Sequence, residues 1–502
     1  MDADYRVKPM KVLLSTPPGK TTELWPPLGL LYIASSVKAK RGDEVKVIDA
    51  FCENLTGAGL LGRVMEEKPD VFGINCSTHT FIDAIGLMQE LRVLRPETKL
   101  VLGGYHATFA AERILKEYQF VDYIIKGEGE RSFPQLLQHI EDGSPPSDVG
   151  GISYLNDGKY VDRPFTLIED LDSLPFPDRS MLGCVDYGYF FQDIRLTFGK
   201  FTTLCTSRGC PYKCTYCSCA ELSLRKWRPR SAENVLDELE MLYDKGYQCC
   251  VFVDDNFTHR RKRVEEICDG IRNRRIKMQF YCEGRVDAAP YELLKKMKGA
   301  GINVIYFGVE SASQHVLDYY QKRTRPDQAI QAIQQAKDAG MIVVTSYIFG
   351  AANETKEDIE RTIEMIERTR PHGVQINILD CLIGTPIWSE LEKNEIVGKD
   401  DWKTNHRIYE YLKDGMSKEE LQKCVVDGYA SHFNSWKSKE GLKALPGLFL
   451  DNSTASRIIL GNLLSPNTWK MMSEGLHTNV LDHLKRDGSR SSTVVQRLEE
   501  SP

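Results

Sequence analysis

Residues 209–218 read GCPYKCTYCS, so Cys210, Cys214 and Cys217 lie within one short loop. A structural zinc site usually takes four ligands in two separated pairs, and Cys205 or Cys219 could add a fourth thiol only by crowding the same loop. Three thiolates spaced C-x3-C-x2-C suit a 4Fe-4S cluster in which one iron has no protein ligand. The loop therefore predicts such a cluster, with zinc as the alternative.

Composition and charge limit what the protein can do. The chain has 502 residues, enough for about three domains, and its 65 basic and 71 acidic side chains give a net charge of -6. Such a balance supplies no overall basic field for nucleic acid. Charges interrupt the N-terminal stretch MDADYRVKPM, and no later run reaches the roughly 18 apolar residues of a membrane span. We expect a cytoplasmic protein without a membrane span or a nucleic-acid partner.

Short β-branched runs alternate with amphipathic helical stretches from 197 to 395, which predicts βα units and a parallel sheet. The expected strands are residues 201–205, 249–255, 277–284, 303–311, 342–350 and 374–380. Six such units form a partial (β/α)6 barrel. Ligands bind at the carboxyl ends of strands in such folds. Polar residues follow the expected strands at that end: Asp254, Asp255, Arg285, Glu310, Ser311, Asn353 and Glu354.

The segment CPYKCTYC is similar to the signature of radical S-adenosylmethionine (SAM) enzymes. In that family the open iron binds the amino and carboxylate groups of SAM, and the aromatic residue before the last cysteine, here Tyr216, packs near the adenine. The resemblance continues in VFVDDNF, which would hold the SAM amino group, in FGVES, which would bond the ribose hydroxyls, and in YIFGAANE, which would approach adenine. It implies cofactor contacts from Asp254, Asp255, Glu310, Ser311 and Glu354.

Two of these assignments have a competing structural interpretation. The segment YIFGAANE departs from the commoner Gly-Leu-Pro-Gly-Glu form of the family, so Glu354 could be a helix cap instead. Arg285 is nominated as a cofactor-binding residue because it follows the third expected strand, but an ion pair between strands would also place an arginine there.

Residues 10–140 form a second run of alternating strands and helices, which predicts a doubly wound, Rossmann-like sheet with its ligand crevice past the strand ends. The loops at those ends are small and glycine-rich, so backbone could approach a large cofactor. The residues nominated for such contacts are Thr78, Gly103, Gly104, His106, Gly127 and Glu128. Directly before a radical SAM barrel, the ordered segments LLSTPP, GINCST, VLGGYHAT and IIKGEGE resemble the cobalamin-binding domain of the cobalamin-dependent radical SAM subfamily.

The loop PPGKTTELWPP lacks the histidine that many cobalamin proteins carry after their first strand in Asp-x-His-x-x-Gly. The resemblance therefore implies cobalamin bound base-off, without a protein histidine on cobalt. His79 and His106 lie in the same domain, but a histidine hydrogen-bonded within a loop is the simpler interpretation of each. No cobalt ligand is nominated.

The chain divides into five expected parts. The segment between the two α/β runs is rich in Pro, Asp and Gly and is typical of a connector, and the C-terminal sequence turns helical before a polar tail. The parts are a cobalamin-binding domain (1–140), a linker (141–196), a radical SAM partial barrel (197–395), a helical C-terminal domain (396–486) and a disordered tail (487–502).

The resemblance implies an enzyme that cleaves SAM with an electron from the reduced cluster. The resulting 5′-deoxyadenosyl radical would take hydrogen from an unactivated carbon of a small-molecule, lipid or tetrapyrrole substrate, methylcobalamin would methylate that carbon, and a second SAM would recharge cobalt. An electron donor such as ferredoxin or flavodoxin would be the partner. Cys381, directly after the last expected strand, is a candidate hydrogen-atom donor or substrate contact, with packing as the alternative.

Three other functions remain open. A cobalamin-associated cyclase, rearrangement or coupling enzyme would use the same cofactors without methyl transfer. A non-catalytic cobalamin-binding module would have no physical use for three clustered thiols. A tRNA methylthiotransferase is disfavoured, because the chain lacks that family's additional cysteines and a basic RNA-binding tail.

Overall fold

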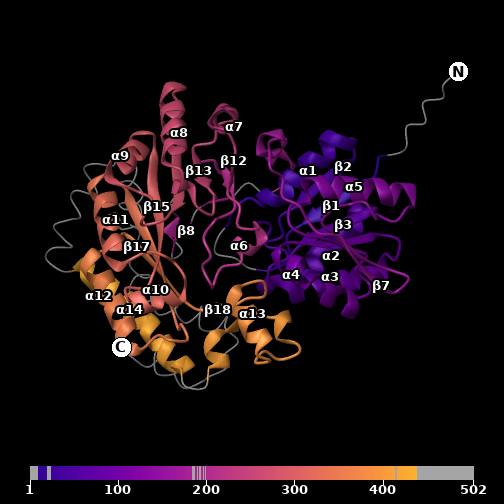
Figure 1. The fold of residues 1–502 in the computed structure, drawn as a ribbon. Coiled ribbons are helices and arrows are strands. Elements are labelled where there is room, and N and C mark those ends of the chain that lie inside the picture. The colour runs from indigo at the N-terminus through magenta and orange to yellow at the C-terminus, as the bar shows by residue number, and fades with distance from the viewer. Residues whose placement is uncertain are drawn as a thin grey trace.

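Two α/β bodies lie side by side in the computed structural model of the chain (Figure 1). The structure describes residues 9–19, 24–183, 187–188, 190–191, 194–195, 197, 199–412 and 415–437. The N-terminal body, drawn in indigo and purple, lies on the right of Figure 1, and the second body, drawn in red and orange, lies on the left. The expected tail at 487–502 and residues 438–486 of the expected C-terminal domain lie outside the described residues.

The N-terminal body contains a seven-stranded sheet of order β2-β1-β3-β4-β5-β6-β7. Its parallel strands are β1 (Lys11–Ser15), β2 (Glu44–Ile48), β3 (Val71–Asn75), β4 (Lys99–Gly103) and β5 (Tyr123–Ile125). The helices between and after them are α1 (Leu28–Arg41), α2 (Gly57–Glu67), α3 (Phe81–Leu94), α4 (Tyr105–Glu117) and α5 (Gly129–Asp142). Because β1 pairs with both β2 and β3, the strand order reverses there, as the predicted doubly wound sheet requires.

Two strands of this sheet lie in the segment expected to be a linker. β6 (Ile152–Asn156) pairs antiparallel with β5, and β7 (Lys159–Asp162) pairs antiparallel with β6. Asp157 and Gly158 join them with φ of 48° and 73°, which is the left-handed turn that suits a two-residue hairpin. The sheet therefore continues past residue 140 as far as Asp162, and the end of the cobalamin-binding domain at 140 stays a prediction.

The second body is built on six parallel strands that follow one another in chain order. They are β10 (Phe201–Leu204), β13 (Cys249–Phe252), β14 (Gln279–Gly284), β15 (Ile302–Glu310), β16 (Ile342–Phe349) and β17 (Gly373–Ile378). Helices packed around them are α7 (Ala232–Asp244), α8 (Arg261–Asn273), α9 (Tyr291–Gly299), α11 (Pro326–Asp338), α12 (Lys356–Thr369) and α14 (Lys418–Lys437). All six predicted strands are confirmed, and Ser231 caps the start of α7, where its Oγ accepts the N–H of Asn234 at 3.1 Å.

Short elements connect and flank these two bodies. The helical ones are α6 (Cys219–Leu222), α10 (Gln314–Tyr319), α13 (Pro386–Lys393) and the 3-10 turns at Thr78–Thr80, Leu171–Ser173, Arg179–Met181, Phe257–His259, Asp401–Lys403 and Ile408–Tyr411. The extended ones are β8 (Phe190–Phe191), β9 (Ile194–Arg195), β11 (Ser207–Arg208), β12 (Arg228–Pro229), β18 (Asp380–Cys381) and β19 (His406–Arg407). β11 and β12 pair antiparallel on either side of the three-cysteine loop.

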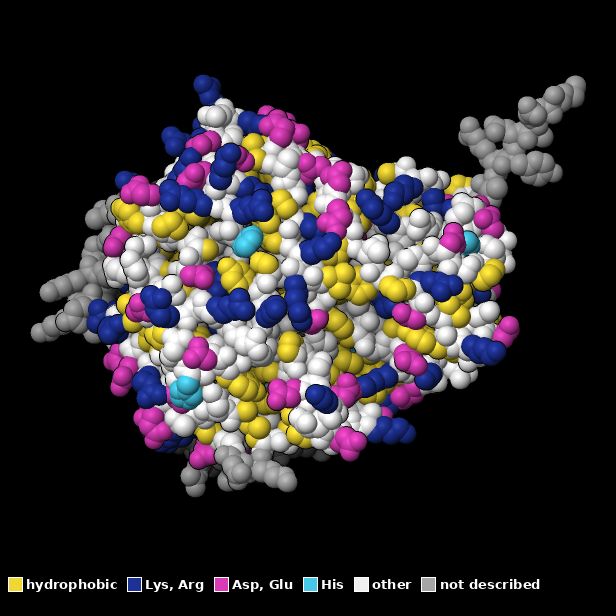
Figure 2. Space-filling model, in the orientation of Figure 1, with side chains coloured by type: hydrophobic (Ala, Val, Ile, Leu, Met, Phe, Trp, Pro, Cys, Tyr) yellow, Lys and Arg dark blue, Asp and Glu magenta, His cyan; other side chains and the backbone are white. Residues whose placement is uncertain are grey.

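Positive and negative side chains are mixed over both bodies on the face that Figure 2 shows. This distribution is the one expected from nearly equal numbers of basic and acidic residues in the sequence. Among the described residues, no helix is long and apolar enough to cross a bilayer.

An apolar cluster joins the two bodies. The segment that follows β17 packs on α3 and α4 of the N-terminal body, where the rings of Phe81 and Trp402 lie 5.4 Å apart. Trp388 and Tyr320 are fully buried in the same cluster. Since burying large aromatic side chains contributes strongly to stability, this cluster favours one fixed arrangement of the two bodies.

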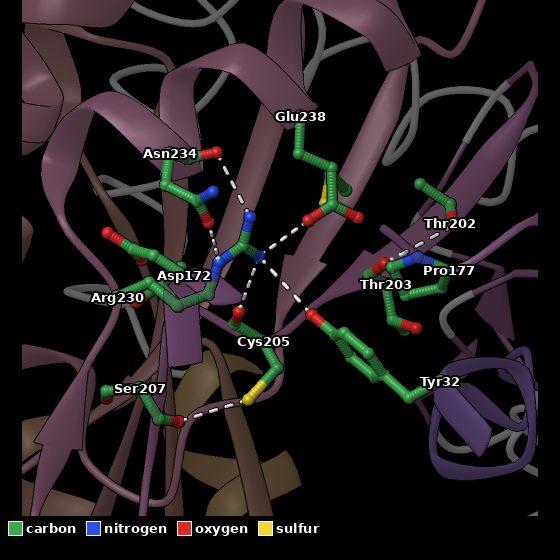
Figure 3. A network of polar contacts seen from close by, with 12 residues as sticks. Tyr32, Asp172, Pro177, Thr202, Thr203, Cys205, Ser207, Arg230, Asn234 and Glu238 are labelled. Carbon is green, nitrogen blue, oxygen red and sulfur yellow. Dashed lines mark hydrogen bonds and ion pairs between the residues drawn. The ribbon is translucent and has the colours of Figure 1, made fainter. Parts of the chain in front are cut away.

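A buried ionic network also joins the two bodies (Figure 3). Glu238 of α7 has no exposed surface, and it forms ion pairs with Arg230 at 2.5 Å and with Arg179 at 2.9 Å. Arg179 belongs to the connection between the bodies, and Arg230 also donates to the hydroxyl of Tyr32 on α1 at 3.4 Å. Through its two arginine partners, the Glu238 carboxylate thus links the N-terminal body, the connection and the barrel.

Replacing this carboxylate tests how much the network contributes. Glu238→Gln leaves Arg179 and Arg230 buried without a counter-charge, and loss of one partner of a buried ion pair costs about 3–5 kcal/mol. We expect the thermal unfolding midpoint to fall by at least about 5 °C, measured by circular dichroism.

Glu233→Gln is the matched control for this change. Glu233 lies on the same helix, but its ion pair with Arg274 is exposed, so the midpoint should change little. Equal falls in the two variants would contradict the importance of the buried network.

Candidate active site

The three-cysteine loop begins directly after β11 and is held at both ends. Gly209 donates its N–H to Asp255 Oδ2 at 2.9 Å, which fixes the start of the loop against the end of β13. Thr215 donates its N–H to the carbonyl of Tyr320 at 3.0 Å, and the N–H of Ile387 on α13 donates to the carbonyl of Thr215 at 3.1 Å. The loop therefore touches both the barrel and the segment that follows it.

The three thiols of the loop are free and close enough to affect one another. Burial raises the pKa of the Cys210 thiol to about 11, and the negative charges of Cys217, Asp255 and Cys214 add to this effect. A positively charged iron–sulfur core would relieve that repulsion. The backbone N–H of Cys219 donates to Cys217 Sγ at 3.4 Å, a type of contact that tunes such clusters.

The sulfurs do not converge as the ligands of one ion would. Within the described part of the chain, no group of three or more His, Cys, Asp or Glu side chains is gathered closely enough to hold a single metal ion. A 4Fe-4S cluster is a wider object whose cysteines ligate separate irons, so it does not require its three sulfurs to meet at one point.

Tyr216 and Glu310 meet beside this loop, together with a lysine that the sequence did not suggest. The Tyr216 hydroxyl donates to Glu310 Oε1 at 3.0 Å, and Lys322 Nζ donates to the same oxygen at 2.7 Å. Glu310 has a φ of 70°, a strained conformation that is common at functional sites. Burial acts to lower the pKa of Lys322, but the charges of Glu310 and Cys214 and the hydrogen bond to Glu310 together outweigh it and leave that pKa above its usual value.

Lys322 lies in the irregular segment QKRTRP between α10 and α11. No periodicity or strand end marks it, and twelve positions separate it from Glu310. Its positive charge also acts on Cys214, where it opposes the increase in pKa that burial causes. Lys322 is therefore a site residue that only the folded chain could reveal.

Arg285 contacts the three-cysteine loop through Tyr212. It forms a bidentate ion pair with Asp287 at 2.9 and 3.0 Å and donates to the carbonyl of Lys322 at 2.9 Å. Its guanidinium group also lies 3.6 Å from the centroid of the Tyr212 ring, between Cys210 and Cys214 in sequence. Within the described residues, Arg285 is thus paired locally with Asp287 and Tyr212, without an ion pair between strands, and a cofactor contact from Arg285 stays a prediction.

Three nominated residues use their polar atoms within the protein. Thr206 and Ser207 donate to the carboxylate of Asp254, which is buried. Ser311 Oγ accepts the N–H of Ser313 at 3.1 Å, and Glu354 accepts the N–H groups of Gly350 at 2.5 Å and Ala351 at 3.3 Å. Burial raises the pKa of Glu354 to about 8.

These internal contacts leave the expectation of direct cofactor contacts from Asp254, Ser311 and Glu354 as a prediction. A buried polar side chain needs a hydrogen-bond partner, and the nearest donors here are neighbouring backbone and hydroxyl groups. The three side chains brace the strand ends, and contacts with SAM from them stay a prediction.

Thr78 and His106 are brought together at the end of the N-terminal sheet. His106 Nδ1 lies 3.1 Å from Thr78 Oγ1, and the imidazole is buried between Phe81 and Trp402. Burial lowers the pKa of His106 to about 4, so the ring is neutral at physiological pH. Among the described residues, His106 Nε2 and Asn75 Oδ1 are buried without a hydrogen-bond partner. Unsatisfied polar atoms at the strand ends fit a crevice that receives a polar ligand.

The nominated glycines differ in what surrounds them. At Gly103 an added Cβ would meet only Ile125 O at 3.8 Å, which is ordinary contact. At Gly104 a Cβ would lie 2.4 Å from Cys76 O, and at Gly127 it would lie 2.6 Å from the Phe165 ring. Both residues also have positive φ. Packing of the protein against itself therefore accounts for Gly104 and Gly127, and a contact with cofactor stays a prediction.

Glu128 and Cys381 also differ from expectation. Glu128 accepts hydrogen bonds from Arg208 and Arg228 of the barrel and from the N–H of Ile168, so its carboxylate serves the domain interface. Cys381 was expected to face the site, but it is fully buried in the apolar cluster between the bodies, and burial raises its pKa to about 12. This burial favours the packing alternative for Cys381, and a chemical role stays a prediction.

The fold and the site together define a class of enzyme in which a cluster loop at the end of a parallel barrel adjoins a doubly wound cofactor domain. Comparison with known families agrees. Residues 204–366 match the radical SAM superfamily and residues 19–137 match the B12 binding domain. The chain belongs to the radical SAM superfamily, in the group that carries an N-terminal B12 binding domain. It is an enzyme whose cofactors are a 4Fe-4S cluster, SAM and cobalamin.

Individual relatives extend over most of the chain. It is 30% identical to an uncharacterised methyltransferase of Pyrococcus horikoshii, over 85% of this chain and 93% of the relative. It is also 30% identical to an anaerobic magnesium-protoporphyrin IX monomethyl ester cyclase of Rubrivivax gelatinosus, over 82% of this chain and 74% of the relative. The fold is similar to that of the cobalamin-dependent SAM radical enzyme OxsB, with a TM-score of 0.67 at 17% identity, over 98% and 83% of the two chains.

The cluster assignment can be tested by chemical analysis. Changing Cys210, Cys214 and Cys217 together to alanine should remove the iron and sulfide of the anaerobically reconstituted protein, about four of each per chain, and its absorption near 400 nm, because no thiolate ligand of the cluster remains. Cys219→Ala, which removes a neighbouring thiol outside the set, should keep both. Retention of iron and sulfide by the triple variant would contradict the assignment.

Lys322 is expected to matter for SAM binding. If Glu310 accepts the ribose hydroxyls, as the family resemblance implies, Lys322→Met leaves that buried carboxylate without its ion-pair partner. Breaking such a pair costs a few kcal/mol, so the Kd for SAM should rise at least about tenfold. Calorimetry on anaerobic protein would measure it, with Lys322→Arg as the charge-conserving control. An unchanged Kd in Lys322→Met would show that the lysine has no part in the SAM site.

Proposed function

We propose that the protein methylates an unactivated carbon of a small-molecule, lipid or tetrapyrrole substrate. The observation that carries the proposal is the direct contact between the two cofactor-bearing parts. Glu128 follows the carboxyl end of β5, and it forms ion pairs with Arg208, which immediately precedes the cluster loop. Ligands of both folds bind at strand ends, so the two cofactors would be neighbours. The methyltransferase relative supports the same conclusion.

The overall reaction balances with an external reductant. Two SAM molecules, two electrons and a substrate R–H give R–CH3, methionine, 5′-deoxyadenosine and S-adenosylhomocysteine. One C–H bond and two S–C bonds break, and the methyl group of the second SAM ends on the substrate carbon. When bound, the cluster supplies the electron that cleaves one SAM, and cobalamin carries the methyl group of the other. A low-potential ferredoxin or flavodoxin would be the electron donor.

The residues of this chain position the reactants and exclude water. Lys322 fixes the Glu310 carboxylate by a 2.7 Å contact, so that it can accept hydrogen bonds from the ribose. Tyr216 is held by the same carboxylate and covers the loop from the side of Tyr320, with the two ring centroids 5.1 Å apart. The apolar cluster between the bodies closes this side of the site, which protects a reactive radical from water.

A cyclase or another rearrangement is the second candidate. The specific observation that favours it is the cyclase relative, which is as similar in sequence as the methyltransferase relative but has a smaller share of its length covered. Such an enzyme would use the same cluster and SAM site and would cleave SAM once, without moving a methyl group.

The two candidates consume SAM differently, and product analysis separates them. With cobalamin and a reductant present, the methyltransferase should form 5′-deoxyadenosine and S-adenosylhomocysteine in comparable amounts and should place the label of methyl-labelled SAM in the product. Candidate lipid, tetrapyrrole and small-molecule substrates would be assayed by mass spectrometry, with protein lacking cobalamin as the control. Deoxyadenosine and a modified product without S-adenosylhomocysteine or methyl label would support the cyclase and overturn methyl transfer.

A further inference from the structure

Four charged side chains form a second ionic network at the junction of the two bodies. Glu128 and Glu130 belong to the turn that begins α5 of the cobalamin domain, while Arg208 and Arg228 are paired neighbours on β11 and β12. We name these four residues the interdomain clamp. Arg208 contacts Glu128 at 3.0 Å and Glu130 at 2.6 Å, and Arg228 contacts both oxygens of Glu128 at 2.9 Å.

The clamp is more buried than an ordinary surface ion pair. The side chains of Glu130 and Arg228 are 5% and 6% exposed, and those of Glu128 and Arg208 are 13% and 18% exposed. Burial acts to raise the pKa of Glu128, but hydrogen bonds from Arg228 and the charge of Arg208 outweigh it and hold that pKa below its usual value. These contacts hold the four side chains in one geometry.

Arginine is the side chain that this geometry requires. The fork of Arg208 reaches two carboxylates at once, and its guanidinium group also lies 4.9 Å from the centroid of the Tyr32 ring on α1. Arg228 meets Glu128 with two nitrogens and also donates to the carbonyl of Ile168. A lysine ammonium group is a single point charge and cannot reproduce such bidentate contacts.

The clamp residues are close in sequence to both cofactor sites. Arg208 is followed by Gly209 and then by Cys210, the first cysteine of the cluster loop. On the other side, Glu128 follows Gly127 at the carboxyl end of β5, the edge where the doubly wound sheet receives its ligand. A displacement of either partner would move a cofactor site relative to the other.

We propose that the interdomain clamp is a positioning device that sets the separation between the cobalamin domain and the cluster loop. This inference rests on the proposed function, because it assigns the clamp to the step in which a methyl group passes from one cofactor site to a substrate activated at the other. The clamp residues touch neither the cofactors nor the reacting atoms in this account. Their loss uncouples SAM cleavage from methyl transfer and leaves SAM cleavage itself in place.

Two measurements on the full-length protein, reconstituted with cluster and cobalamin, test the clamp. The variants are Glu128→Gln, which removes the shared carboxylate charge, and Arg208→Lys, which keeps the charge but loses the fork. Dipolar electron paramagnetic resonance between the reduced cluster and Co(II) should give a broader or longer distance distribution in both variants. The ratio of deoxyadenosine to S-adenosylhomocysteine should increase about tenfold over the parent protein, a factor that corresponds to about 1.4 kcal/mol.

Glu169→Gln is the matched control. Glu169 pairs with Lys226 in the same neighbourhood, but both side chains are more than half exposed, so the distance and the ratio should stay at parent values. Iron and cobalt content and circular dichroism establish that each variant is folded and loaded, and Arg208→Lys replaces Glu128→Gln if the latter does not fold.

The outcomes separate the clamp from the proposed function. An unchanged distance distribution in a folded, loaded variant overturns the positioning role of the clamp, whatever products the parent protein forms. A parent protein that forms no S-adenosylhomocysteine refutes methyl transfer, but the distance measurement still decides whether the clamp positions the two sites. A parallel decline of both products at unchanged distance would indicate a general structural role and would also overturn the proposal.

Discussion

Buried charge that must be paired is the constraint on which the arrangement of this protein depends. Glu238 has no exposure to water, and it is acceptable in the interior only because Arg179 and Arg230 meet it. Those arginines come from the connection and from the barrel, and Tyr32 of the cobalamin domain completes the contact. Since an unpaired buried charge is so costly, the network is satisfied only when all three parts are in place.

Strand ends explain why the chemistry gathers where it does. Parallel sheets leave irregular, polar segments at their carboxyl ends, and both bodies of this protein bring one such end to their common boundary. The cluster loop follows the first barrel strand, and the Glu128 turn follows β5. The contact of these two segments brings the two strand-end regions side by side. The apolar cluster with Trp388 and Trp402 encloses it from another side.

Local pattern was enough to predict the strands and to single out the three-cysteine loop. Each depends on residues close in sequence, as in the alternation around 197–395 and in the spacing of Cys210, Cys214 and Cys217. The hairpin of β6 and β7 also had a local signal, the Asp157–Gly158 pair between two strand-like runs, but the surrounding Pro, Asp and Gly obscured it.

What could not be predicted depends on partners far apart in the chain. Lys322 became a site residue only because folding places it against Glu310 and Tyr216. Glu128 was nominated for cobalamin, but its arginine partners are 80 and 100 positions away. Cys381 followed a barrel strand as expected, yet the neighbouring domain covers it with apolar side chains. Sequence spacing carries no information about such encounters.

We expect the N-terminal domain to present cobalamin to the cluster loop without a histidine on cobalt. The loop after β1 contains no histidine, and His106 is held by Thr78 and packed against aromatic rings. Electron paramagnetic resonance of the Co(II) state in the full chain tests this most directly. We expect a base-off spectrum with no superhyperfine splitting from a nitrogen ligand. A spectrum with nitrogen splitting would contradict this expectation, and so would a protein that binds no cobalamin.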